Sequence, residues 1–272
     1  MLRSMYSGIS GLRGFQTKLD VIGNNIANVN TFGFKKGRVT FKDMISQQVQ
    51  GASSPQANRG GTNPRQVGLG SQLGSIDTIH TPGSAQTTSR PLDLSISGEG
   101  FFIVADGPTS YYTRAGNLYL DHEGNLVNAD GLYVQGYSAG NDTTLSNLQI
   151  SATDDSRIES FDISPSGEIT AIFTNGDVEP IGNLAIAVFN NPEGLTKAGN
   201  NLYQVSNNSG EPDVGIPGEV GGAIVGGTLE MSNVDLAEEF TEMIVAQRGF
   251  QANTRIITTS DEILQELVNL KR

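Results

Sequence analysis

The side chains that most often carry chemistry are sparse in this chain of 272 residues. It has no cysteine, so it cannot form a disulfide, a thiolate zinc site or a cysteine nucleophile. Its two histidines, His80 and His122, do not stand at a spacing that binds a metal ion, and no G-x-S-x-G nucleophile motif is present. We therefore predict that the chain is not an enzyme and has no metal and no cofactor.

Three further patterns have simpler explanations than catalysis or ligand binding. Glu238 and Glu239 are adjacent on a predicted helix, point to different sides of it and cannot act as an acid/base pair. The glycines of residues 68–74 lack the lysine and the following helix of a phosphate-binding loop. Asp154 and Asp155 lack the twelve-residue loop that holds calcium. None of the three is predicted to be a site.

Apolar side chains at helical spacing mark both ends of the chain, and no proline interrupts residues 1–54 or 218–272. Such stripes predict two long amphipathic helices, which most simply pair with each other as a coiled coil. The alternative is that each helix docks on the globular core of its own chain. The residues of the predicted apolar seam are Met5, Ile9, Leu12, Leu19, Ile26, Leu236, Phe240, Met243, Phe250, Ile257 and Leu264.

The first helix is predicted over residues 4–28, where it meets a cluster of asparagines. Asparagine amides compete for nearby backbone groups, and Gly33 can adopt a positive φ, so the chain should turn there. The glycines within this helix weaken it, each by roughly 1 kcal/mol relative to alanine. We therefore expect it to become fully ordered only on assembly.

The central part of the chain has the pattern of β structure. Short apolar runs recur at intervals of roughly ten residues, separated by turns such as Asp130-Gly131 and Asn175-Gly176. The predicted fold class is mixed α and β, with terminal helices in a coiled coil and a central antiparallel β-rich domain. The predicted segments are residues 1–45 (helix and turn), 46–74 (extended linker), 75–230 (β-rich outer domain) and 231–272 (helix).

The net charge of −12 is unevenly distributed. Residues 1–50 carry +5, residues 51–230 carry −14 and residues 231–272 carry −3. An acidic body disfavours nucleic acid as a partner. No apolar run is long enough to insert into a membrane, and the N-terminus lacks the pattern of a cleaved signal peptide.

Four segments, in this order, resemble the signatures of the flagellar rod and hook protein family. They are LDVIGNNIANVNTFGFKK at residues 19–36, RPLDLSISGEGFF at 90–102, the stretch 183–202, and SNVDLAEE with AQRGFQAN at 232–239 and 246–253. Residues 112–117 and 121–128 are similar to the hairpin that follows the second signature. The motif residues that carry the resemblance are Asn24, Asn25, Asn28, Gly33, Phe34, Gly98, Gly100, Phe101 and Phe102.

The resemblance implies a structural subunit of the axial tube of the bacterial flagellum. Its partners would be copies of itself in a helical homopolymer, neighbouring rod, hook, cap and junction proteins, and the flagellar export apparatus. It would be found in the basal body or hook, exported without a cleaved signal peptide, with the seam residues at the subunit interface. Hook is favoured, with distal rod as the alternative. A secreted β-rich adhesin and an enzyme with an unrecognised site are rivals from other classes.

Overall fold

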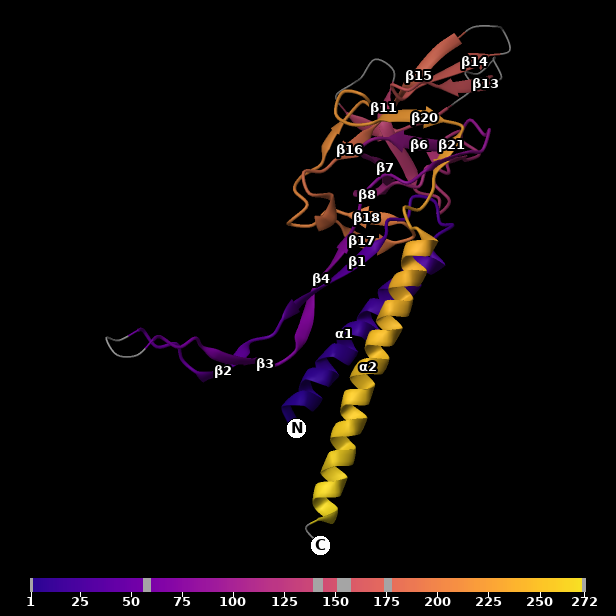
Figure 1. Cartoon of the computed structure of the whole chain (residues 1–272). Helices are drawn as coiled ribbons and strands as arrows, with labels where there is room; N and C mark the ends of the chain where they lie inside the picture. The colour runs from indigo at the N-terminus through magenta and orange to yellow at the C-terminus, as the bar shows by residue number, and fades with distance from the viewer. Residues whose placement is uncertain (1, 56–59, 139–143, 151–157, 174–177, 271–272) are drawn as a thin grey trace. The chain divides into compact units, whose positions relative to one another are not determined.

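A computed structural model describes residues 2–55, 60–138, 144–150, 158–173 and 178–270 (Figure 1). The chain divides into two compact units, each made from separate stretches of sequence. The helical unit comprises Met1–Ala27, Gly37–Thr78 and Asp235–Arg272, and the β unit comprises Asn28–Lys36 and Ile79–Val234.

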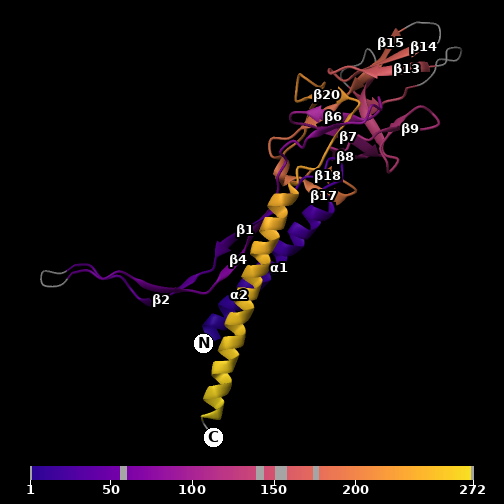
Figure 2. The same ribbon diagram turned by 45° about the vertical axis from the view of Figure 1, so that its right-hand side comes forward.

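Two long helices form most of the helical unit: α1 (Leu2–Ala27) and α2 (Leu236–Asn269). Asp235 caps α2, because its side chain accepts hydrogen bonds from the backbone N–H groups of Ala237 (2.8 Å) and Glu238 (3.4 Å). Figures 1 and 2 show the two helices running side by side in opposite directions. The apolar spacing at the chain ends therefore placed both helices close to their observed bounds.

The prediction that these helices pair as a coiled coil is wrong. A coiled coil requires apolar side chains of one helix to insert between those of the other. Here a Cβ atom added to Gly249 would lie 2.5 Å from the Phe15 ring, and one added to Gly11 would lie 2.9 Å from the Asn253 amide. Glycines of one helix thus face side chains of the other, while Phe240 of the predicted seam keeps 49% of its surface exposed.

Strands extend the helical unit beside α1. β1 (Gly37–Asp43) pairs antiparallel with β4 (Ser71–Thr78), and β2 (Ser46–Gln50) pairs antiparallel with β3 (Arg65–Gly68). The ring of Phe41 on β1 packs on α1, with its centroid 6.5 Å from that of Phe15. Every residue of β2 and β3 is exposed.

Within the described residues, the β unit contains a thirteen-stranded sheet and two two-stranded sheets. Along its main path the large sheet has the order β13-β14-β15-β11-β7-β8-β18-β17, and β20 pairs with β6 and β21 with β5 outside it. The strands are β5 (Ala85–Thr87), β6 (Leu94–Ser97), β7 (Phe101–Asp106), β8 (Thr109–Thr113), β9 (Tyr119–Leu120), β10 (Leu126–Val127), β11 (Tyr133–Ser138), β12 (Leu145–Asn147), β13 (Ile158–Ile163), β14 (Glu168–Phe173), β15 (Val178–Leu184), β16 (Ile186–Val188), β17 (Thr196–Gly199), β18 (Leu202–Gln204), β19 (Asp213–Gly215), β20 (Ala223–Gly226) and β21 (Thr228–Glu230). A short 3₁₀ helix, η1 (Pro192–Gly194), precedes β17.

β7 lies between two buried clusters, and this position accounts for its apolar sequence. Phe102 and Val104 point into one buried cluster, whereas Phe101 and Ile103 point into a second cluster on the other face. Successive side chains of a strand point to opposite faces, so a strand buried on both sides needs an unbroken apolar run. The four apolar residues at positions 101–104 meet that need.

Candidate assembly surfaces

None of the eleven seam residues is fully buried within a single chain. Seven are half-buried: Met5, Leu12, Leu19, Ile26, Met243, Ile257 and Leu264. Four are exposed: Ile9, Leu236, Phe240 and Phe250. The predicted seam omits further exposed apolar residues of α2, among them Ile244 and Val245, because they lie outside its single stripe. The two helices therefore present apolar surface that their own chain does not cover.

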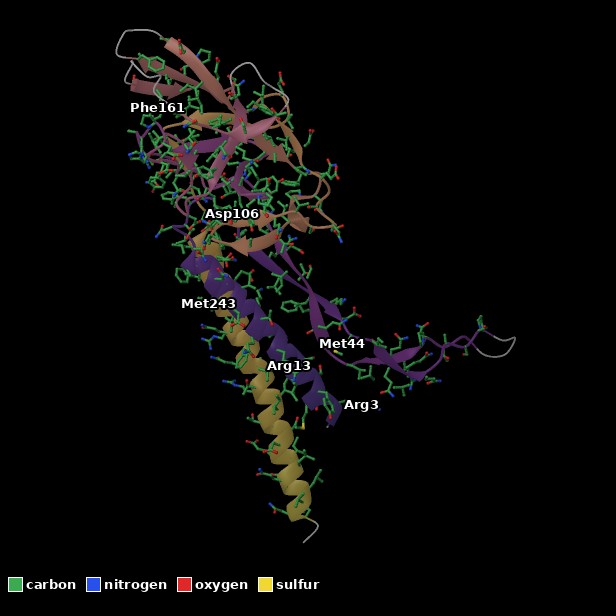
Figure 3. The ribbon with its side chains drawn as sticks, turned by 180° about the vertical axis from the view of Figure 1, so that it is seen from behind. Arg3, Arg13, Met44, Asp106, Phe161 and Met243 are labelled. Atoms are coloured by element: carbon green, nitrogen blue, oxygen red, sulfur yellow. The ribbon has the colours of Figure 1, made fainter. Side chains whose placement is uncertain are left out.

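A groove of about 580 Å³ runs along the opposite side of α1 from α2. Tyr6 and Ile9 line it from α1, and Leu73 lines it from β4. Figure 3 shows Arg3 and Arg13 along α1, with Met44 beside them just after β1. All six residues line the groove, which is thus apolar with two cationic side chains.

One side chain of the asparagine cluster near the C-terminal end of α1 is buried. Asn25 is buried, donates to the carbonyl oxygen of Gly37 (2.9 Å) and accepts from its N–H (3.0 Å), in the manner of a backbone partner. It also donates to Oε1 of the buried Glu239 on α2 (3.2 Å). Asn24 is exposed, and Asn28 is half-buried and accepts from the Thr31 hydroxyl. Of the three motif asparagines, Asn25 therefore ties together α1, β1 and α2.

Gly33 lies where only glycine fits. Its φ is +69°, and a Cβ there would lie 2.6 Å from the backbone nitrogen of Ala115. Its N–H donates to the carbonyl oxygen of Glu230 (2.8 Å), which joins the two ends of the β unit. The neighbouring Phe34 is half-buried, with the Lys197 ammonium 5.3 Å from its ring centroid.

A buried ionic cluster, formed by Lys35, Arg114 and Glu230, lies next to Gly33. The exposed fractions of these side chains are 0%, 3% and 3%, respectively. Glu230 accepts from Lys35 Nζ at 2.5 Å and from Arg114 Nη1 at 3.2 Å, so two cations share one anion. Sequence reasoning missed this cluster, although a glutamate within the apolar run of residues 229–231 was a signal for it.

Burial sets the protonation of the groups around this cluster. It lowers the pKa of Lys35, and the charge of Glu230 opposes that effect. It also lowers the pKa of Arg114, again against the charge of Glu230. The pKa of His80 falls to about 4, first through burial and then through the charges of Lys35 and Arg114. His80 is therefore neutral at pH 7, and it packs edge-on against Tyr203, whose pKa burial raises to about 12.

The second motif forms the turn between β6 and β7. Gly98 and Gly100 have φ values of +112° and +136°, and both Phe101 and Phe102 are buried. The carbonyl oxygen of Gly98 accepts from Arg114 Nη2 at 2.6 Å. The fold thus brings Gly33 and Gly98, 65 positions apart in the sequence, to the same arginine.

No group of three or more histidine or acidic residues that could hold a metal ion occurs within the described residues. Asp154 and Asp155 lie outside those residues. Neither α1 nor α2, within its described part, contains a stretch apolar enough to span a bilayer.

Three family models match separate parts of the chain. The one described as flagella basal body rod protein matches residues 5–35. The flagellar hook protein FlgE/F/G D1 domain matches residues 95–171, and the flagellar basal body rod FlgEFG protein C-terminal model matches residues 225–270.

Curated relatives match the chain from end to end. The flagellar basal-body rod protein FlgG of Bacillus subtilis (strain 168) is 56% identical over 274 residues, which cover 100% of both chains. FlgG of Agrobacterium fabrum is 38% identical over 272 residues, covering 96% of this chain and 97% of the relative. The flagellar hook protein FlgE of Borreliella burgdorferi is 34% identical over an alignment of 441 residues, which covers 100% of both chains. The chain therefore belongs to the flagellar basal-body rod and hook protein family, and it is a structural subunit of the flagellar axis rather than an enzyme.

Proposed function

We propose that this chain is the distal rod subunit and polymerises with copies of itself into a helical tube. Sequence reasoning favoured the hook over the rod, but the lengths of the relatives favour the rod. The FlgG relatives align over 272 to 278 residues, close to the 272 residues of this chain. The alignments with the FlgE relatives extend over 441 and 463 residues, far more than the length of this chain. Much of each hook protein is therefore aligned with no residue of this chain.

The observation that carries the proposal is the uncovered apolar surface of α1 and α2. Tyr6 and Phe240 are large exposed side chains on helices that already contact each other. Soluble monomers rarely leave such surface uncovered over a contiguous area, and burying it stabilises association. Contacts between different surfaces of neighbouring copies build an open helical assembly when the rotation from copy to copy does not close a ring. The eleven seam residues would contribute to these contacts.

The hairpin of β2 and β3 supports the same assembly. A two-stranded hairpin with no covered face is only marginally stable in water. Both of its strands are exposed along their whole length within one chain. We propose that neighbouring copies cover it in the polymer.

The proposal extends to position and partners. Terminal helices would line the central channel, and the acidic β unit would lie outside them. Rod, hook, cap and junction proteins would be its neighbours along the axis, and the flagellar export apparatus would deliver it without a cleaved signal.

Cysteine labelling tests this proposal, because the natural chain has no cysteine. Ser138 is exposed at the end of β11, so we would label a Ser138→Cys variant in motile cells with a membrane-impermeant maleimide dye. For a rod subunit we expect no label on intact cells, and labelled basal bodies once the cell wall is removed. Ser209 is 1% exposed, so a Ser209→Cys variant controls for access of the dye.

Spots at the base of each external filament on intact cells would instead identify a hook subunit. Diffuse surface label with no relation to flagella would contradict both and favour an adhesin.

A further inference from the structure

The C-terminal end of α2 extends beyond the helix against which it packs. Gly8 of α1 lies against Ile257 of α2, and α1 begins only six residues earlier, at Leu2, whereas α2 continues to Asn269. Figures 1 and 2 both show this extension past the N-terminal end of α1. We call residues 263–270 the overhang.

One face of the overhang is apolar and exposed. Ile263, Leu267 and Leu270 stand at positions i, i+4 and i+7 and form a stripe along the helix. Leu267 keeps 49% of its surface exposed and Leu270 keeps 82%. Glu262 and Glu266, four residues apart, flank this stripe on one side. The overhang is thus a short amphipathic helix with an acidic border.

The groove along α1 has the complementary properties. Its floor is apolar, through side chains that include Ile9 and Leu73, and Arg3 and Arg13 line it. Within the described part of the chain neither arginine has an ion-pair partner. A groove with an apolar floor and unpaired cations suits an amphipathic helix with acidic flanking residues.

We propose that the overhang of a second copy of this chain docks in this groove. The inference rests on the proposed polymer and specifies one of its contacts. The groove follows α1 from Arg3 to Thr17, about 21 Å at the rise of an α-helix, whereas residues 263–270 span about 11 Å. The overhang of the same chain does not reach it, because α2 packs on the opposite side of α1, where Gly8 and Gly11 lie.

Disulfide trapping tests the contact directly. We would co-express a Leu73→Cys variant with a Leu267→Cys variant, isolate basal bodies, oxidise them mildly and separate the chains without reductant. A product of two chains, dependent on both variants, is expected. Val245 lies on the same helix with similar exposure (56%), so Val245→Cys paired with Leu73→Cys is the matched control and should give at least about tenfold less product.

Charge reversal gives an independent measurement. Arg13→Glu or Glu266→Arg alone should lower the amount of the chain in basal bodies by roughly fivefold to tenfold, and the two together should restore it. Both residues are exposed, so the monomer should fold normally.

Several results would overturn the docking proposal alone: basal bodies that contain the chain but no Leu73–Leu267 product, an equally strong product from the control, or a product joining the overhang to a different protein. Basal bodies that lack the chain altogether would overturn the proposed rod function as well.

Discussion

The buried ionic cluster predicts unequal effects when its charges are removed one at a time. It holds two cations, Lys35 and Arg114, and one anion, Glu230. Glu230→Gln leaves both cations buried without a counter-charge, whereas Lys35→Met leaves Arg114 paired with Glu230. We therefore expect Glu230→Gln to destabilise the β unit more than Lys35→Met does.

The structure allows both magnitudes to be estimated. Removing one partner of a buried ion pair costs about 3–5 kcal/mol, and Glu230→Gln should fall in this range. Lys35→Met keeps an apolar stem of similar length. The carbonyl oxygen of Thr81 loses the hydrogen bond that Lys35 Nζ donates at 2.8 Å but still accepts one from Asn233 Nδ2 at 3.3 Å. Losing one hydrogen bond whose acceptor keeps another donor costs about 0.5–1.5 kcal/mol, so Lys35→Met should cost about 1 kcal/mol.

Urea unfolding of the full-length monomer at pH 7 measures this difference. Six of the seven tyrosines lie in the β unit, so tyrosine near-ultraviolet circular dichroism reports mainly on that unit. Glu179 is exposed on β15, and Glu179→Gln is the matched control, with an expected effect within about 0.5 kcal/mol. If Lys35→Met cost as much as Glu230→Gln, the excess of buried positive charge would not be what makes Glu230 important.

Three further predictions concern single residues. Gly33→Ala should destabilise the β unit by at least about 1–2 kcal/mol in the same assay, because alanine disfavours φ of +69° and its Cβ would strike the backbone of Ala115; an unchanged midpoint would contradict this. Asn25→Ala should cost about 1–3 kcal/mol, since both backbone groups of Gly37 lose their partner, and far-ultraviolet circular dichroism of the helices measures it. Burial lowers the pKa of His80 from 6.5 to about 4, so between these values the unfolded chain binds a proton that the folded chain does not. Stability should therefore fall by up to about 3 kcal/mol through this residue as pH drops from 7 to 4, and His80→Phe should lose that part of the acid sensitivity.

The sequence alone determined which elements form. Apolar spacing predicted helices at both ends because an amphipathic helix repeats every 3.6 residues, and that period is visible without any knowledge of contacts. The asparagine cluster predicted the end of α1, which the structure places at Ala27. Short apolar runs similarly predicted strands in the central part of the chain, and the run at residues 101–104 lies in β7. These signals are local, because each can be recognised from residues that lie close together in the sequence.

Only the tertiary structure decided which surfaces meet. The apolar seam predicted a coiled coil, but the observed contact puts Phe15 against Gly249, because a glycine lets a ring approach the backbone more closely than two large side chains can pack. Lys35 followed a helix in sequence and carried no sign of burial, yet it is enclosed because its partner Glu230 lies 195 residues away. Pairings over such separations depend on how the chain folds back on itself. For that reason the pattern of residues could not identify the partners of the buried Glu230 or the groove along α1.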